Sequence, residues 1–268
     1  MLVVLNGIGI WIVHSRALLP LVLLAAIGVS FFVEQLIPYN PDWNRPHQDV
    51  ARDWTHLGVN ECANVASVAA LPLFAALTPW SGAWPSQWPL VFQLGISIVV
   101  LDFGVTLTHW ASHRVPLLWR FHAVHHSVKR FYGLNGLMKH PIHQALELTV
   151  GVAPLVAVGL PTDVASLLAL ATAIQLLLQH SNADYATGAF GYFLALNRAH
   201  RFHHLKWPGI GDCNFGLFTN VWDLLLGTWS FDANRSFTSD DLGIGKEPDY
   251  PTRYCDQLKA PFRSRASS

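Results

Sequence analysis

The chain has 268 residues, of which 51% are hydrophobic and only 13% are charged. This composition suits a membrane protein better than one whose whole surface faces water. The 17 basic residues balance the 17 acidic ones, so no overall positive field would gather nucleic acid, and we expect no nucleic-acid partner. The three cysteines, Cys62, Cys213 and Cys255, form no C-x-x-C pair, which excludes a disulfide framework and a cysteine-held metal cluster.

Five apolar segments approach the roughly 20 residues that a helix needs to cross a bilayer. In chain order they are residues 17–37, 59–77, 89–113, 146–160 and 164–180. The last two are short and lie close together, so a re-entrant hairpin is an alternative to two full crossings. Residues 1–13 have no basic region before their apolar run, which favours a leading interfacial or membrane segment over a removable signal peptide.

Basic residues indicate how such a bundle is oriented, because cytoplasmic loops are enriched in Lys and Arg. Residues 114–139 contain Arg114, Arg120, Lys129, Arg130 and Lys139 and no acidic residue. We therefore expect an all-α integral membrane bundle of about four to five membrane helices, carrying a histidine-rich helical cap on its cytoplasmic side.

Eleven of the 14 histidines fall between residues 109 and 204, and eight of them form three boxes. Side chains three or four positions apart share one face of a helix, so each box would present its imidazoles together. Burying so many imidazoles requires a partner for each nitrogen, and metal ions supply one. Eight ligands exceed the three or four of a single-metal site, so we expect two ions. The boxes are His109-x-x-x-His113, His122-x-x-His125-His126 and His200-x-x-His203-His204.

In combination these boxes resemble the fatty acid hydroxylase/sterol desaturase superfamily. His140-Pro141, His180-Ser181-Asn182 and the run from Asp212 to Gly216 strengthen the resemblance, which covers about residues 101–229. It implies a membrane-bound oxygenase whose two non-haem iron ions use O2 to hydroxylate or desaturate a lipid, such as a sterol or a fatty acyl group. The metal ligands carried over from the family are His109, His113, His122, His125, His126, His140, His180, His200, His203 and His204.

The resemblance also divides the chain into N-terminal membrane helices (1–100), a catalytic region (101–229) and a polar C-terminal tail with a loosely ordered end (230–268). Two departures from the family pattern leave the lipid and the reaction outcome open. Asn197 stands where many relatives have proline, and His143 stands near a position where many have an acidic residue.

Ligand imidazoles usually donate their second N–H to a carboxylate or a carbonyl oxygen. Asp102 lies two helical turns before His109 on the same face, and Asp184 and Asp223 are further candidates for this role, together with Glu147 and Asp212. We expect no catalytic residue beyond the metal ligands themselves.

The same residues bear on other possible functions. Neither H-E-x-x-H nor H-x-x-E-H occurs, which argues against a zinc peptidase. A membrane metal-binding or metal-transport protein without oxygenase activity is the main alternative. No dinucleotide-binding turn follows a strand, so we expect a separate electron donor, either a ferredoxin or a cytochrome with its reductase. The residues of a docking face for that donor would be Lys129, Arg130, Arg198, Arg201 and Lys206.

Overall fold

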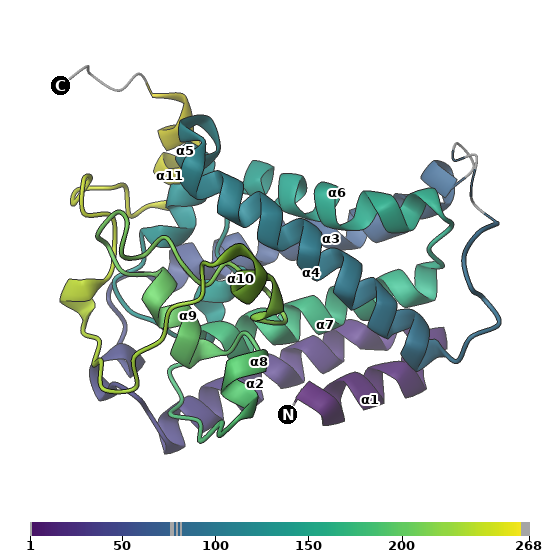
Figure 1. The fold of residues 1–268 in the computed structure, drawn as a ribbon, viewed down its shortest axis with the longest axis horizontal. Helices are drawn as coiled ribbons and strands as arrows, with labels where there is room; N and C mark the ends of the chain where they lie inside the picture. The colour runs from purple at the N-terminus through teal and green to yellow at the C-terminus, as the bar shows by residue number, and fades with distance from the viewer. Residues whose placement is uncertain (1, 76–77, 79, 81, 264–268) are drawn as a thin grey trace.

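A computed structural model describes residues 2–263 except 76, 77, 79 and 81. The regular structure of this part of the chain is helical, and β-pairing is limited to isolated bridges. Within the described residues, four helices are long and apolar enough to cross a membrane. Figure 1 shows them running side by side, which confirms the expected all-α membrane bundle. They are α2 (Leu19–Leu36), α3 (Val50–Ala75), α4 (Leu90–Arg114) and α7 (Thr162–His180).

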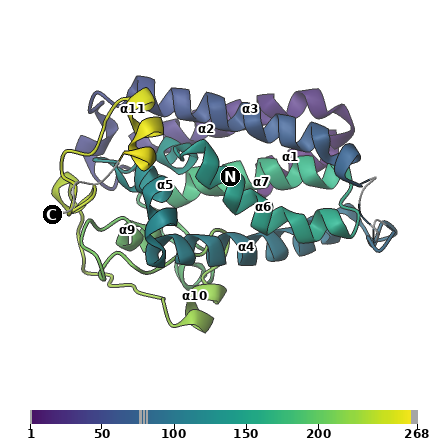
Figure 2. The same cartoon turned by 90° about the horizontal axis from the view of Figure 1, so that it is seen from above.

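Two shorter helices complete the bundle: α1 (Leu2–Ile12), which packs on α7, and α6 (Pro141–Ala157), which packs on α4. Seen from above in Figure 2, α6 lies over α7 and beside α4. The segment that we predicted at 146–160 is thus helical but begins earlier, at Pro141. It is not among the four helices that meet the length and hydropathy of a membrane span.

The predicted start of the second membrane helix was wrong by more than two turns, because α3 begins at Val50 rather than near Val59. The polar residues of the additional turns, Arg52, Asp53 and His56, are buried inside the protein. Asp53 accepts hydrogen bonds from Arg52 Nε (2.7 Å) and from Tyr132 Oη (2.7 Å). A helix whose polar groups bond to other parts of the chain needs no apolar sequence there, so hydropathy alone does not reveal its first turns.

The cap is built at one end of the bundle, to the left in Figure 1. Its helices are short and are joined by irregular segments, one of which brings the Cys213 and Phe215 carbonyls and the Asp212 side chain to histidines. They are α5 (Pro116–His126), α8 (Phe190–Phe193), α9 (Asn197–His203), α10 (Val221–Leu226) and α11 (Tyr254–Lys259). Single 3₁₀ turns complete the described structure at Val13–Leu18, Pro41–Asn44, Gly133–Leu137, Ser239–Asp241 and Ala260–Phe262.

The C-terminal tail folds back onto the cap instead of extending away from it. Gln257 of α11 is buried, donates to Ser127 Oγ (3.0 Å) and places its Oε1 2.9 Å from His56 Nε2. The tail thereby ties α3 to the end of α5. The loosely ordered end that we predicted falls partly on residues 264–268, which lie outside the described residues.

Candidate metal centre

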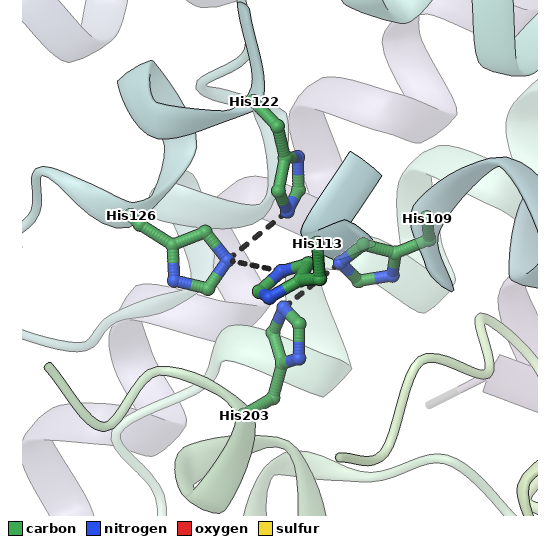
Figure 3. Close-up of side chains that lie close together, drawn as sticks. All are labelled: His109, His113, His122, His126 and His203. Carbon is green, nitrogen blue, oxygen red and sulfur yellow. Dashed lines mark hydrogen bonds between the residues drawn. The ribbon is translucent and has the colours of Figure 1, made fainter. Parts of the chain in front are cut away.

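Nine histidines converge in the cap as two adjacent groups whose ring nitrogens lie within 4.8 Å of one another inside each group. Figure 3 shows the side chains of the first group, whose rings point toward one another. We call them the five-histidine group (His109, His113, His122, His126 and His203) and the four-histidine group (His125, His180, His200 and His204).

Each H-x-x-H-H box contributes to both groups. In the second box, His122 and His126 are four residues apart on one face of α5 and join the five-histidine group, whereas His125 points to the other group. In the third box, His200 and His204 join the four-histidine group and His203 joins the five-histidine group. Because neighbouring residues on a helix project about 100° apart, one box can reach two adjacent points.

Where a histidine Nδ1 atom donates a hydrogen bond, the Nε2 atom of that ring keeps the lone pair that can bind a metal ion. His109 Nδ1 lies 2.9 Å from the Phe215 carbonyl oxygen, and His203 Nδ1 lies 2.8 Å from that of Cys213. Each Nδ1 is therefore the donor, and each neutral ring keeps a lone pair on Nε2. These two Nε2 atoms are 2.8 Å apart, facing each other with no proton to share.

The four-histidine group repeats this arrangement. His125 Nδ1 donates to the Met138 carbonyl (3.0 Å) and His180 Nδ1 donates to the Leu176 carbonyl (3.1 Å), yet their Nε2 atoms are 3.2 Å apart. His180 Nε2 also lies 3.2 Å from the Nε2 atoms of His200 and His204. Lone pairs that converge in this way repel one another unless a cation lies between them.

Electrostatics keeps these imidazoles in the neutral form that binds metal. Burial, reinforced by the neighbouring histidines, lowers the pKa of the α5 histidines His122, His125 and His126 well below the usual value near 6.5. Burial likewise lowers the pKa values of His200, His203 and His204. A neutral imidazole has a free lone pair, whereas an imidazolium has none.

The residues present therefore fit a pair of metal ions. Nε2 spacings of 2.8–3.2 Å are those expected between neighbouring ligands when each metal–nitrogen bond is about 2.1 Å long. Neither group contains a carboxylate or a thiolate. All-imidazole sites suit iron, zinc, copper or nickel rather than magnesium or calcium.

His140 is the one predicted ligand that the structure does not bring to either group. Its Nδ1 accepts a hydrogen bond from the backbone N–H of Ile142 (3.1 Å), so it caps the first turn of α6. Its Nε2 lies 3.3 Å from the Leu258 carbonyl oxygen, and its ring packs on Phe121. Both ring nitrogens thus have protein partners, and the His-Pro pair serves to begin a helix.

Asp102 contacts no histidine among the described residues, contrary to the role that its helical position suggested. Its carboxylate accepts hydrogen bonds from the backbone N–H groups of Leu217 (3.0 Å), Phe218 (2.8 Å) and Thr219 (3.1 Å), and from Trp222 Nε1 (3.1 Å). Asp102 therefore anchors the segment that precedes α10.

Asp223 holds the same segment at its other end. It accepts from the N–H groups of Phe215 (2.7 Å) and Gly216 (2.7 Å), and burial raises its pKa. The Phe215 carbonyl, fixed by these bonds, is the one that receives the Nδ1 proton of His109. Asp102 and Asp223 thus act on the histidines through the backbone, which residue spacing could not indicate.

Among the other acidic candidates, Asp212 bonds directly to a histidine and Asp184 does not. Asp212 Oδ1 lies 2.8 Å from His113 Nδ1, and this hydrogen bond lowers the pKa of Asp212. Asp184 is exposed in the segment after α7, where its backbone N–H donates to the Ile37 carbonyl. The direct carboxylate–histidine pair therefore forms at Asp212, on the loop that follows the third box.

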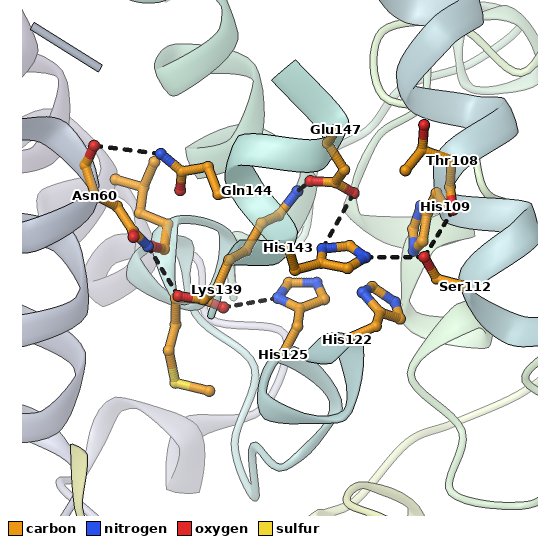
Figure 4. Close-up of polar contacts among 12 residues, drawn as sticks. Asn60, Thr108, His109, Ser112, His122, His125, Lys139, His143, Gln144 and Glu147 are labelled. Atoms are coloured by element: carbon orange, nitrogen blue, oxygen red, sulfur yellow. Dashed lines mark hydrogen bonds and ion pairs between the residues drawn. The ribbon is translucent and has the colours of Figure 1, made fainter. Parts of the chain in front are cut away.

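His143, for which the sequence predicted no role, lies against the five-histidine group. Figure 4 shows it on α6 between Ser112 and Glu147, with its ring beside that of His122. Glu147 in turn pairs with Lys139 Nζ (2.5 Å). The signal in the sequence was the spacing of His143 and Glu147, four residues apart and hence on one face of a helix.

A cavity of about 260 Å³ reaches the five-histidine group at His113, His126 and His203. It lies where α4 ends, and its wall carries both aromatic and charged side chains. They include Trp119, Trp207, Arg114, Lys206, Lys246, Asp212 and Glu247.

The basic face expected to receive an electron donor is only partly at the surface. Arg130 is buried and donates to both carboxylate oxygens of Asp49 (2.6 and 2.9 Å). Arg201 is also buried, with its guanidinium 3.7 Å from the ring centre of Tyr39. That prediction was therefore wrong for these two arginines, because internal partners hold them; Lys129, Arg198 and Lys206 are at least partly exposed.

Comparisons with known proteins agree with this geometry. The family model for fatty acid hydroxylases matches residues 94–228. The chain is 33% identical over 251 residues to an ornithine lipid hydroxylase, OlsE, of Rhizobium tropici, covering 90% of this chain and 74% of the relative. It is 28% identical over 160 residues to an alkylglycerol monooxygenase of Danio rerio, covering 59% of this chain and 33% of that relative. No solved structure matches the chain.

Proposed function

Because the chain belongs to the fatty acid hydroxylase family, we propose that it is a membrane-bound, non-haem di-iron oxygenase that hydroxylates a lipid with O2. Family membership and the lipid hydroxylases and monooxygenases among its relatives support an oxidoreductase that modifies lipids. We favour hydroxylation over desaturation because these relatives are named as hydroxylases and monooxygenases.

The observation that carries the proposal is the convergence of Nε2 lone pairs in two adjacent groups. Iron bound there would supply the redox chemistry that activates O2 toward a C–H bond. The protein's own residues set the geometry. Backbone carbonyls and Asp212 hold the Nδ1 protons of five ligands, so that their Nε2 lone pairs point inward. These five are His109, His113, His125, His180 and His203. Phe131 and Phe215 pack against the imidazoles.

The cavity beside the five-histidine group supports a route for the substrate. It opens where the apolar helix α4 ends at Arg114, so a lipid lying in the bilayer can place its polar end there. Arg114 and Lys206 offer positive charge to a carboxylate or phosphate of the headgroup. Ornithine lipid, the substrate in the name of one relative, is the first candidate.

In the proposed function, reducing equivalents come from a separate electron donor, either a ferredoxin or a cytochrome with its reductase. The cap faces the cytoplasm, since the basic residues between 114 and 139 lie at that end of the bundle.

The proposal is tested with protein purified from iron-sufficient cells. We expect about two iron atoms per chain by elemental analysis and O2-dependent addition of one oxygen atom to a lipid. His203→Ala removes a ligand of the five-histidine group and should lower both the iron content and the turnover. His47→Ala, at an exposed position before α3, is the matched control.

Full iron content and activity in His203→Ala would refute the ligand assignment. Metal flux into protein-containing vesicles without lipid oxidation would instead favour the alternative of a metal transporter.

A further inference from the structure

We propose that His143 and Glu147 of α6 are positioning residues, which hold the imidazole of His122 through a single bound water molecule. The inference rests on the proposed function in one respect, namely that His122 binds a metal ion through Nε2. It concerns residues outside the nine histidines of the two groups, and it explains why three polar atoms are buried together beside them.

The three side chains meet in the interior of the cap. His122, His143 and Glu147 are each at most 2% exposed, and one nitrogen or oxygen atom of each lies within 4.8 Å of the others. The ring centres of His122 and His143 are 4.5 Å apart. Among the described residues, His122 Nδ1, His143 Nδ1 and Glu147 Oε1 are buried without a hydrogen-bond partner. His143 Nδ1 and Glu147 Oε1 face each other at 3.7 Å, which is longer than a hydrogen bond.

Proton positions follow from the atoms that do have partners. Ser112 Oγ donates to the Thr108 carbonyl (2.7 Å), so at its contact with His143 Nε2 (2.9 Å) the hydroxyl oxygen accepts. His143 therefore carries its proton on Nε2 and has a lone pair on Nδ1. His122 faces the five-histidine group with Nε2, which lies 3.0 Å from His126 Nε2, so its proton is on Nδ1.

The three buried atoms that lack a hydrogen bond are therefore one donor, His122 Nδ1–H, and two acceptors, His143 Nδ1 and Glu147 Oε1. A water molecule complements them, because its oxygen accepts one hydrogen bond and its two hydrogens donate the others. His143 Nδ1 and Glu147 Oε1 are 3.7 Å apart, so one water can donate to both, and the ring of His122 lies beside them, with its centre 4.5 Å from that of His143. A cation fits worse, since the N–H of His122 and the ammonium of Lys139 would repel it.

The acceptors are themselves held in place. Lys139 Nζ lies 2.5 Å from Glu147 Oε2, and the Lys139 backbone carbonyl receives Asn60 Nδ2 (3.0 Å) from α3. Glu147 therefore acts on His122 as Asp212 acts on His113, but across one water. Such outer partners fix the ring orientation and raise ligand basicity, and their loss typically costs about 10- to 100-fold in metal affinity.

The test is a titration of metal-free protein in nanodiscs with Co²⁺, monitored by its absorption spectrum and by bound metal per chain. His143→Leu should weaken one of the two sites about 10- to 100-fold, leave the other unchanged and shift the Co²⁺ bands. Asp212→Asn should affect the same site. Gln144→Ala is the matched control, because Gln144 bonds to the Asn60 carbonyl and Asn64 Oδ1 on α3.

Two conservative variants separate a positioning role from a purely structural one. The amide of His143→Asn can place an acceptor near the former Nδ1, toward the water, whereas that of His143→Gln reaches toward Ser112. We expect His143→Asn to restore most of the affinity and His143→Gln to restore little. The reverse order, or wild-type affinity at both sites in a folded His143→Leu protein, would overturn the inference. Absence of metal binding by the wild-type protein would instead overturn the proposed function.

Discussion

At the scale of single residues, Arg130 shows that a basic side chain predicted at the surface can be buried and paired inside the protein. Arg130 stands in a run of basic loop residues, yet it bonds Asp49 and stacks 3.8 Å from the ring centre of Tyr132. The pair joins the segment before α3 to the segment after α5. Burial alone would raise the pKa of Asp49, but the hydrogen bonds and charge of Arg130 outweigh it and hold this pKa below its usual value near 3.8.

This pair should make stability depend on pH. Because the folded-state pKa of Asp49 is depressed, its contribution is fully present above the unfolded pKa near 4 and is lost as the pH falls toward the folded value. Asp49→Asn should cost about 3 kcal/mol of unfolding free energy at pH 7, since it leaves Arg130 buried without a charge partner. The difference from wild type should shrink below about pH 4.

Thermal unfolding in detergent between pH 7 and pH 3 measures the effect. Asp42→Asn is the control, because Asp42 and Arg45 form an exposed pair (3.7 Å) that should contribute almost nothing. An equal loss in both variants would contradict the assignment.

At the scale of elements, the metal centre depends on how closely α4 and α6 approach. A Cβ atom on Gly104 would lie 2.6 Å from the Cα atom of Gly151, and one on Gly151 would lie 2.5 Å from a side-chain carbon of Leu101. Small residues at a crossing let two backbones come together. This approach places His143 of α6 against Ser112 of α4, one helical turn from His109.

We therefore predict that Gly104→Ala destabilises the protein by about 1–3 kcal/mol through overpacking, although alanine is the better helix former. Because the obstructing atoms belong to the Gly151 backbone, they cannot move aside as a side chain would. Gly95→Ala on the same helix meets nothing within 4 Å and should be neutral or stabilising. Thermal unfolding compares the two, and equal stability would refute the crossing argument.

At the scale of the whole molecule, the bundle sets where the chemistry can occur. The two histidine groups lie at the end of the membrane helices, and the cavity that reaches them opens beside Arg114, at the last turn of α4. A lipid held in the bilayer by its acyl chains would thus offer its polar end to the histidine groups. The folded-back tail joins the cap to α3 through Gln257, which contacts Ser127 and His56.

From this placement we predict that the added hydroxyl lies at the polar end of the lipid and not far along an acyl chain. Fragmentation of the product in a mass spectrometer locates it. Lys206→Gln should raise the KM for a lipid with an anionic headgroup about two- to fivefold, as expected for a charge pair near water worth about 0.5–1 kcal/mol. Lys259→Gln on α11, exposed and outside the cavity lining, is the control. A hydroxyl confined to acyl fragments would contradict the prediction.

The fold class and the grouping of the histidines could be predicted from local sequence. Long apolar segments predicted the membrane helices, and the three- and four-residue histidine spacings predicted side chains that gather on helix faces, because both signals depend only on residues close together in the chain. His180, predicted from its resemblance to a further ligand position, lies in the four-histidine group.

Tertiary structure alone decided how these histidines divide into two groups and what each acidic side chain contacts. Asp102 bonds a segment 115 to 120 residues away, and the Nδ1 proton of His109 goes to a carbonyl 106 residues away. His140 turned out to cap a helix, while His143, which had no assigned role, lies beside His122. Helical periodicity places a side chain on a face, but its hydrogen-bond partner is whatever polar group the fold brings against that face.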